Sequence, residues 1–403
     1  MLTEKRQVLR EDLPFLDLAN PDFSVRSQTV LDAREKSWCA RTPYGLAILR
    51  YDEVNALLRD LRLRQGSYAW PKLCGAEGSF ADWWMRMLLS KEGADHSRLR
   101  RLVNPAFSPR LVRSMTPKFQ ELANNLIEGF IERGECQFVD EFAAPYATQV
   151  ICSLLGISLN EAQRLAELAV DMGLALGVTY KQEEEIVNKA TDLMFEYSHQ
   201  AVETLKKTGL GDDFLSSLIR ANEDKSALSD QELHDMVVLA IFGGIDTTRN
   251  QISLAMDLFI QHPEQWELLA KKPELAAAAV EEVMRFRPTV TWITREALED
   301  FEYQGVFIEK GTTLHLLSQA AGTDPTIFPD PEFDISKKRR PHFGFGAGTH
   351  HCIGHFIARG DMKEALALLA QKLKNVRYNG TPQYLPDSGN TGLNSLPISF
   401  ERR

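Results

Sequence analysis

One cysteine lies in a glycine-rich stretch whose residue types could build an anionic metal ligand. Residues 343–354 read Phe-Gly-Phe-Gly-Ala-Gly-Thr-His-His-Cys-Ile-Gly, and an apolar, helix-forming run over residues 353–373 begins directly after Cys352. Three glycines within five residues let the backbone turn tightly and approach a ligand closely. A thiolate at a helix N-terminus is stabilised by the helix dipole and the free amide groups, which lower the thiol pKa. The sequence therefore predicts a sulfur ligand held on a rigid turn.

Cys352 also admits two plainer interpretations, a buried structural cysteine or a zinc ligand. Four nearby histidines could share a zinc ion with it, namely His342, His350, His351 and His355. A zinc site needs three or four converging ligands, and no second cysteine is close. The five cysteines of the chain are scattered without a Cys-x-x-Cys pair, which argues against disulfides, zinc ribbons and iron–sulfur clusters.

A second stretch combines a helix defect with an acid and a hydroxyl. A Ser-x-x-Glu capping box predicts a long helix over residues 229–261. Gly243 and Gly244 lie in its middle, where each glycine costs about 1 kcal/mol relative to alanine. Close helix packing would explain them, but Asp246 and Thr247 follow directly. A carboxylate beside a hydroxyl, next to an apolar stretch, suits proton delivery into a dry pocket.

Three further charged groups are ambiguous when taken singly. His96 and Arg100 lie four residues apart on one face of a predicted helix, so both could converge on one anion. Glu282 and Arg285 are spaced for an ion pair that is worth about 0.2–0.5 kcal/mol on a surface. Arg295 follows a β-branched run. Solvated structural charges are the common outcome for such residues.

The elements that would position these residues are mostly helical. Helical periodicity dominates residues 117–207, whereas residues 42–51 and 301–317 have the pattern of short strands. Neither an internal repeat nor a low-complexity linker occurs, and nothing marks a domain boundary. We expect a mainly α chain with a smaller β-rich region, forming one domain over residues 1–403.

Together these residues resemble the motifs of the cytochrome P450 superfamily. Phe345-Gly346-x-Gly348-x-His350-x-Cys352-x-Gly354 resembles its haem-binding signature, with six fixed positions in ten matched. The stretch that contains Asp246 and Thr247 is similar to the family's oxygen-binding sequence, and the family's His-x-x-x-Arg and Glu-x-x-Arg elements are matched as well. All of them follow the family's order between about residue 42 and the C-terminus, which is more specific than any single motif.

The resemblance implies the mainly helical cytochrome P450 fold, with haem b held between the long helix and the cysteine loop. Cys352 would be the iron ligand, and a thiolate favours cleavage of the O–O bond. Phe345 and Gly346 would lie against the sulfur and shield it from water. The two haem propionates would be neutralised by four residues: His96, Arg100, Arg295 and His350. Dioxygen would bind on the side that faces Gly243, Gly244 and Thr247.

The activity implied by the resemblance is that of a monooxygenase, which inserts one atom of dioxygen into a hydrophobic small molecule by hydroxylation or epoxidation. Thr247 would stabilise the bound oxygen and Asp246 would relay protons. Electrons would come from NAD(P)H through a ferredoxin and a ferredoxin reductase. A peroxide-using peroxygenase, or a non-catalytic haem protein such as a gas sensor or carrier, is the alternative. Neither needs the pair formed by Asp246 and Thr247.

The chain departs from the family's pattern where many relatives have Phe-Asp-x-x-Arg. Lys337 occupies the arginine position, and an ammonium group is a point charge instead of a bidentate fork. We expect Arg339 or Arg340 to supply the missing contact.

A docking surface and a substrate pocket also follow from the family's arrangement. Nine cations would form the surface for an acidic ferredoxin: Arg98, Arg101, Arg110, Arg113, Lys337, Lys338, Arg339, Arg340 and Arg359. The pocket would be lined by residues 68–89, 165–180, 238–242, 290–293 and 391–396, with Arg86 or Asn394 anchoring a polar end of the substrate. These segments are mainly apolar, so a hydrophobic substrate is expected.

Composition narrows the setting. The 403 residues are 44% hydrophobic, carry a net charge of −10 and have a pI near 5.5, which speaks against nucleic acid as the main partner. No run of 18 apolar residues occurs, and residues 1–22 lack the apolar region of a signal peptide. We expect a cytoplasmic protein that does not span a membrane.

Overall fold

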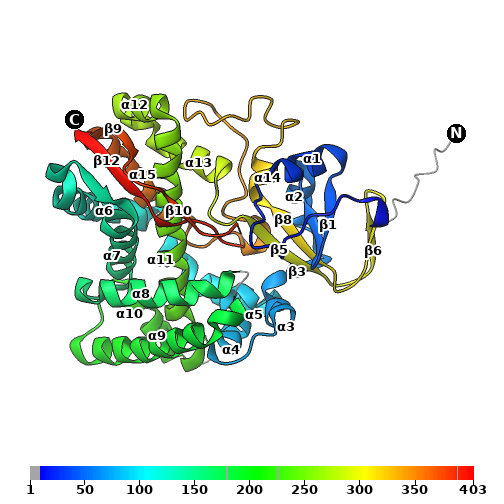
Figure 1. The fold of residues 1–403 in the computed structure, drawn as a ribbon. Coiled ribbons are helices and arrows are strands. Elements are labelled where there is room, and N and C mark those ends of the chain that lie inside the picture. The colour runs from blue at the N-terminus through cyan, green and yellow to red at the C-terminus, as the bar shows by residue number, and fades with distance from the viewer. Residues whose placement is uncertain (1–9, 178–179, 225–226, 388) are drawn as a thin grey trace.

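The chain folds into a mainly helical body with a smaller β-rich region, as predicted. The computed structural model describes residues 10–177, 180–224, 227–387 and 389–403. Figure 1 shows the N-terminal strands on one side of the molecule and most helices on the other, with α11 running between the upper and lower helices. The α-helices are α1 (Gln28–Lys36), α2 (Tyr51–Leu57), α3 (Trp70–Cys74), α4 (Ser79–Arg86), α5 (Gly93–Val103), α6 (Pro109–Phe130), α7 (Ala144–Leu155), α8 (Ala162–Gly173), α9 (Tyr180–Thr208), α10 (Phe214–Glu223), α11 (Asp230–Gln261), α12 (Pro263–Lys271), α13 (Ala276–Phe286), α14 (Ser318–Gly322) and α15 (His355–Lys372).

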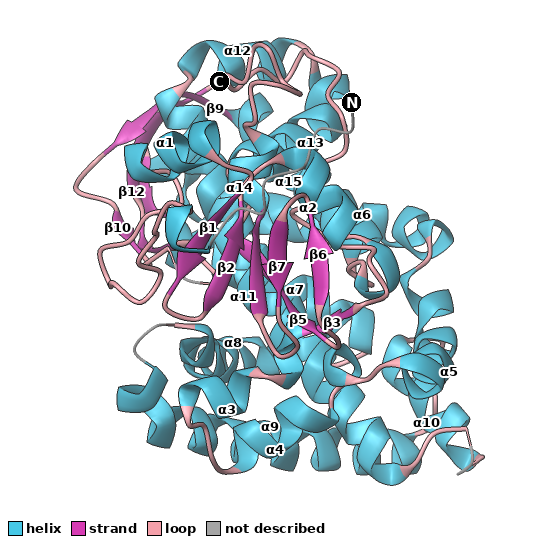
Figure 2. Cartoon of the chain, turned by 90° about the vertical axis from the view of Figure 1, so that its right-hand side faces the viewer, coloured by secondary structure: helices cyan, strands magenta, loops and turns pink. Residues whose placement is uncertain are grey.

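The main sheet has the strand order β1-β2-β8-β5-β3. Strands β2 and β8 are parallel and the other neighbours are antiparallel. Figure 2 shows this sheet in the centre of the view, with α1 and α14 above it and α3 and α4 below. Its strands are β1 (Cys39–Thr42), β2 (Gly45–Ile48), β3 (Leu63–Gln65), β5 (Trp292–Ala297) and β8 (Thr313–Leu317).

The remaining strands form three smaller sheets, which pair β4 and β9 with β12, β10 with β11, and β6 with β7. Figure 1 shows β9 and β12 at the far side of the helical body from β1. Their bounds are β4 (Glu135–Gln137), β6 (Phe301–Tyr303), β7 (Val306–Ile308), β9 (Leu373–Tyr378), β10 (Gln383–Tyr384), β11 (Leu393–Ser395) and β12 (Pro397–Arg402).

Helix α11 is fixed at its start by the predicted capping box. The Glu232 amide donates to the Ser229 hydroxyl at 3.2 Å, and the Ser229 amide donates to the Glu232 carboxylate at 3.0 Å. Most side chains along the helix are buried on every face, because α7, α8, α9 and α15 all pack against it. A helix enclosed in this way holds its middle, where Gly243 lies, at a fixed place in the core.

Apolar side chains form one large helical core and two smaller clusters beside the main sheet. The large core includes Trp83 and Phe242, whose rings meet edge to face at 5.6 Å. Phe343 and Ala347, from the loop that leads to Cys352, belong to the first sheet cluster. The cysteine loop is therefore anchored on the sheet side, while the helix that follows it packs into the helical core.

Candidate functional site

The cysteine loop is a tight hairpin that leads into α15. The Cys352 amide donates to the Phe345 carbonyl at 2.9 Å, and the Gly346 amide donates to the Phe343 carbonyl at 2.8 Å. Gly346 and Gly348 have φ values of +67° and +72°, a region that strongly favours glycine. A cavity of about 650 Å³ is lined on this side by Phe345, Gly346 and Cys352. The thiol therefore belongs to a cavity wall and is not enclosed in the apolar core.

The expected lowering of the thiol pKa is not what the structure gives for the free side chain. Burial raises the pKa of Cys352, while backbone amides at Gly354 and His355 and the charges of Arg100 and Arg359 act in the opposite direction. The helix N-terminus is thus present where it was predicted, but desolvation outweighs it. A bound metal cation removes the thiol proton outright, so the site suits a thiolate ligand once iron is coordinated.

The opposite wall of the cavity comes from the middle of α11. The two glycines there are explained by different surroundings. A Cβ added to Gly244 would lie 2.3 Å from the Ile151 side chain on α7, whereas one added to Gly243 would meet nothing within 4 Å. Close helix packing requires Gly244, and Gly243 leaves open space in the cavity. Thr247 lines the cavity one turn later and donates its hydroxyl proton to the Gly243 carbonyl at 2.6 Å.

Asp246 lies behind this wall and is 6% exposed. Its two carboxylate oxygens accept hydrogen bonds from the side-chain amides of Asn250, at 3.1 Å, and Asn390, at 3.0 Å. Arg249 lies 3.6 Å away as an ion-pair partner. Burial raises the pKa of the Asp246 carboxyl despite these partners. Because Asn390 also lines the cavity, this amide joins the buried acid to the cavity edge.

Asn390 was not anticipated from the sequence. It lies 144 positions from Asp246 in the chain, in the loop between β10 and β11, and no local pattern marks it. Arg249 stands three residues after Asp246, so its i,i+3 spacing was a usable signal.

The four predicted propionate ligands lie at the cavity on three different elements. His96 and Arg100 are on α5, Arg295 is on β5 and His350 precedes Cys352; all four line the cavity. The rings of His96 and His350 lie 4.3 Å apart. Arg100 donates to the His351 carbonyl, so half of its guanidinium group is already engaged with the cysteine loop.

These groups fit an anionic cofactor. Both ring nitrogens of His96 are buried without a hydrogen-bond partner among the described residues, and burial lowers the pKa of His96 to about 4. Arg295 is 4% exposed; its hydrogen-bond acceptors among the described residues are uncharged, the Gln65 side chain and the Thr294 carbonyl, although the charge of Glu92 also acts on it. Buried donors and cations of this kind are costly unless an anion completes them. Two haem propionates would do so.

One acidic residue near these four predicted propionate ligands, which we call the cradle, was not anticipated from the sequence. Glu92 accepts a hydrogen bond from the Gln65 amide at 2.7 Å, and its carboxylate lies 3.1 Å from Nε2 of His350. Glu92 immediately precedes α5 and stands four residues before His96. This i,i+4 spacing could have indicated that the two side chains lie close together. The cradle therefore contains a carboxylate that orients His350 beside the predicted cations.

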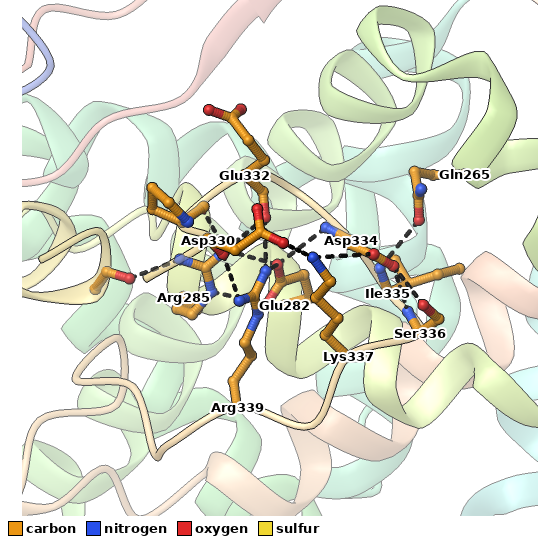
Figure 3. A network of polar contacts seen from close by, with 12 residues as sticks. Gln265, Glu282, Arg285, Asp330, Glu332, Asp334, Ile335, Ser336, Lys337 and Arg339 are labelled. Carbon is orange, nitrogen blue, oxygen red and sulfur yellow. Dashed lines mark hydrogen bonds and ion pairs between the residues drawn. The ribbon is translucent and has the colours of Figure 1, made fainter. Parts of the chain in front are cut away.

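The ion pair between Glu282 and Arg285 is buried, with the two side chains 2% and 1% exposed and 2.6 Å apart. Arg339 lies 3.3 Å from the same carboxylate. It therefore supplies the contact that we expected from Arg339 or Arg340 because Lys337 occupies the arginine position. Lys337 instead pairs with Asp330 and lies 3.7 Å from Asp334. Figure 3 shows Arg339 and Arg285 converging on Glu282 while Lys337 points to the two aspartates.

The cavity confirms four of the five predicted lining segments and corrects the fifth. Its apolar wall is formed by aromatic and aliphatic residues from these segments, including Trp70, Trp84, Leu89, Leu176, Tyr180, Leu239, Phe242, Val290 and Ile293. Residues 391–396 do not line it, because Thr391, Leu393 and Leu396 are packed in the interior. Gly389 and Asn390, just before this segment, face the cavity instead.

Neither predicted polar anchor reaches the cavity. Arg86 is held by Asp235 on α11 at 3.3 Å, and Asn394 is exposed on β11. Alternation along a short strand turns Asn394 away from its buried neighbour Leu393. A different polar residue, His315 on β8, lines the cavity.

The nine predicted docking cations do not all present free charge. Four of them are neutralised by carboxylates: Arg98 by Glu232, Lys337 by Asp330, Arg339 by Glu282 and Arg359 by Glu281. The other five are exposed, and no ion pair joins them to another residue in the described part of the chain: Arg101, Arg110, Arg113, Lys338 and Arg340. Arg101 shares a surface hollow with Thr349 of the cysteine loop.

The structure bears on two further expectations. Within the described ranges, no three or more His, Cys, Asp or Glu side chains converge as a metal site would require, and His342 contacts Glu281 instead. No helix in the described part of the chain combines the length and apolarity needed to cross a bilayer.

Comparisons with known proteins agree on one family. A family model described as Cytochrome P450 matches residues 158–400, more than half of the chain. The chain is similar to the luteothin monooxygenase of Streptomyces thioluteus, with 39% identity over 394 residues and 96% of each chain covered. It is 32% identical over 351 residues to the mycinamicin IV hydroxylase/epoxidase of Micromonospora griseorubida, covering 85% of this chain and 86% of that one.

Solved structures give the same result for the fold. The cytochrome P450 enzyme CxnD, for C–S bond formation in chuangxinmycin biosynthesis, matches with a TM-score of 0.86 and 29% identity, covering 97% of this chain and 99% of that one. CalO2 matches with a TM-score of 0.84 and 29% identity over 94% of this chain.

Proposed function

Because the chain belongs to the cytochrome P450 family and is a P450 monooxygenase, we propose that it oxidises an elongated, mainly apolar small molecule with electrons from a ferredoxin. The observation that carries this proposal is the cavity of about 650 Å³, whose walls include Cys352 on one side and Thr247 on the other. The same cavity extends along an aromatic wall that includes Trp70 and Trp84. A substrate lying on this wall would be largely removed from water.

We assign haem binding to residues that already surround the cavity. Cys352 would coordinate the iron, and His96, Arg100, Arg295 and His350 would hold the propionates through charge-assisted hydrogen bonds. When bound, haem b supplies the iron on which dioxygen is activated. The guanidinium carbon of Arg359 lies 4.4 Å from the centre of the Phe345 ring. The Phe345 ring would keep water from the sulfur of Cys352.

Thr247 and Asp246 would manage protons on the opposite side. The Thr247 hydroxyl, now directed to the Gly243 carbonyl, could turn to donate into the cavity at no cost to the helix ladder. Burial raises the pKa of Asp246, which makes its carboxyl a better proton acceptor than an exposed aspartate. Asn390 touches both Asp246 and the cavity, so proton transfer would pass along this edge.

Electrons would reach the haem from an acidic ferredoxin and its NAD(P)H-dependent reductase. The support is the group of exposed cations that form no ion pair with any described residue, among them Arg101 beside the cysteine loop. Opposite charges on the two proteins would speed their encounter. We place the enzyme in the cytoplasm, where NAD(P)H is produced.

Product analysis tests the proposal. The purified haem protein is incubated with ferredoxin, reductase, NADH and a set of hydrophobic compounds, beginning with luteothin and mycinamicin IV because two relatives are named for them. An oxygenated product that requires NADH and both partner proteins is the expected result. Product formed with hydrogen peroxide alone, and not with NADH, would assign the protein to the peroxygenases. Haem binding without any product from the set would favour a sensor or carrier.

A further inference from the structure

His315 is an unusual residue for the wall of an apolar cavity. It lies on β8, is 7% exposed, and lines the cavity. Its Nδ1 atom is buried without a hydrogen-bond partner among the described residues. A buried polar atom without a partner costs about 1–3 kcal/mol. No role in the proposed haem site or proton relay involves this side chain.

The neighbours of His315 hold its ring in place and leave one nitrogen unsatisfied: the ring hydrogen-bonds to the Leu46 backbone, whereas Nδ1 has no partner among the described residues. Its cross-strand partners are Ala47 on β2 and Thr294 on β5, both small, so neither covers the ring. The ring of Trp292 stands perpendicular to it at 5.7 Å, and that of Tyr44 lies at 6.1 Å. These contacts fix the orientation of the imidazole, so a ligand group would bond to the ring at Nδ1.

We propose that His315 is the polar anchor of the substrate cavity, binding an uncharged hydroxyl or amide group of an aromatic molecule. The inference deepens the proposed function, since it takes this cavity to be the substrate site. Hydroxyl and amide groups both donate and accept, so either can complete an imidazole ring. The aromatic walls at Trp70, Trp84 and Trp292 favour a substrate with aromatic rings.

The charges around this end of the cavity favour a neutral partner. Burial lowers the pKa of His315 to about 4, so the ring is neutral at pH 7 and cannot pair with a carboxylate. Lys181 also lines the cavity, but its ammonium group donates to the Gly75 carbonyl at 2.5 Å and to Glu184 at 2.7 Å. Arg100 and Arg295 also line the cavity but are assigned to the haem propionates, so among the described lining residues a substrate carboxylate or phosphate would find no free cation, which disfavours both.

Matched pairs of probes test the anchor on the oxidised, haem-loaded protein, without any redox partner. One pair is 4-phenylphenol and 4-methylbiphenyl, and a longer pair is 4-hydroxystilbene and 4-methylstilbene; each pair differs only in hydroxyl against methyl. Dissociation constants are measured by tryptophan fluorescence and by the haem spectrum. The measured quantity is the preference, the Kd of the methyl probe divided by that of its hydroxyl partner.

We expect His315→Leu to lower this preference about tenfold in at least one pair, because the hydroxyl is then buried unpaired. The Kd of the methyl probe should stay within about twofold, which also shows that the cavity is intact. His315→Gln, which keeps a hydrogen-bonding side chain, should restore most of the preference. Tyr44→Phe, which removes the neighbouring hydroxyl, should leave it unchanged.

An equal preference in wild type and His315→Leu for both pairs would overturn the anchor, and so would loss of the preference in Tyr44→Phe alone. Because no electrons are supplied, these results do not depend on ferredoxin or on oxygen chemistry. A failure of the monooxygenase assay with normal probe binding would count against the proposed reaction and leave the anchor standing.

Discussion

Arg339 and Arg285 donate to the same oxygen of Glu282, at 3.3 Å and 2.6 Å. Glu282 is 2% exposed, so its charge is balanced by two guanidinium groups instead of one. Arg339 also donates to the carbonyls of Asp330 at 2.6 Å and Glu332 at 2.7 Å. It therefore ties the loop that follows α14 to α13, in the place where a family arginine would stand at position 337.

Arg339→Ala should lower the free energy of unfolding by about 2–3 kcal/mol, because it removes three hydrogen bonds, one to a buried carboxylate and two to loop carbonyls. Lys337→Ala is the matched control. Lys337 is 39% exposed and its partner Asp330 is 58% exposed, so its loss should cost less than about 1 kcal/mol. Denaturant unfolding followed by the haem spectrum compares the two; equal losses would show that Arg339 stabilises the fold no more than the exposed Lys337 does.

Replacing Thr247 by alanine should separate NADH consumption from product formation. Thr247 lines the cavity, and its hydroxyl would have to turn from the Gly243 carbonyl to donate there; without it proton delivery is disordered, so hydrogen peroxide accumulates. We expect the product formed per NADH to fall about tenfold, within the range of a positioned proton donor. Thr247→Ser retains the hydroxyl and should stay coupled. Unchanged coupling in Thr247→Ala would remove this residue from the mechanism.

Asp246→Asn should act on rate and not on coupling. The substitution keeps an oxygen for one of the two amide donors, Asn250 and Asn390, but it can no longer gain and lose a proton. Turnover should slow about 100-fold, with a larger solvent isotope effect and with most of the NADH still recovered as product. A variant that runs at the normal rate would show that protons reach the cavity by another route.

The sequence was sufficient for the fold class and for the residues that local motifs mark. The cysteine loop, the capping box of α11 and the buried pair of Glu282 and Arg285 depend on spacing within one element, which a sequence displays directly. Arg339 was one of two candidates named for the family contact, and its distance to Glu282 selects it over Arg340.

What the sequence could not give depends on contacts between distant segments. Asn390 reaches Asp246 only because the loop between β10 and β11 folds back onto α11. The sign of the Cys352 pKa shift depended on burial, which the local helix signal does not report. His315 lies in an alternating strand where any polar residue would be assigned to the solvent side, and only the sheet order places it against the cavity.

His315 should also leave a signature in the pH dependence of stability. The folded-state pKa of His315, about 4, lies below the ordinary histidine value of 6.5, so between these values the unfolded chain binds up to one more proton than the folded one. Stability is therefore lost as the pH falls through this window, by up to about 1.4 kcal/mol per pH unit. The free energy of unfolding of His315→Leu minus that of wild type should therefore be about 2 kcal/mol larger at pH 5 than at pH 7.5, measured by urea unfolding. Parallel pH profiles of the two proteins would mean that the ring is solvated or already charged in the fold.

The reduction of the enzyme by ferredoxin should depend on the exposed cations for which the described part of the chain offers no ion-pair partner. Arg113, at the start of α6, is exposed, and α6 packs against α15, the helix that follows Cys352. Arg113→Glu should slow the first electron transfer about tenfold at low ionic strength. The difference should shrink near 1 M salt, where the screening length falls from about 10 Å to about 3 Å.

Lys337→Ala is the control, since Asp330 already offsets the charge of Lys337. Stopped-flow reduction under carbon monoxide measures both variants. If Lys337→Ala slowed the step and Arg113→Glu did not, the ferredoxin would dock beside the loop around Glu282 instead of beside α6.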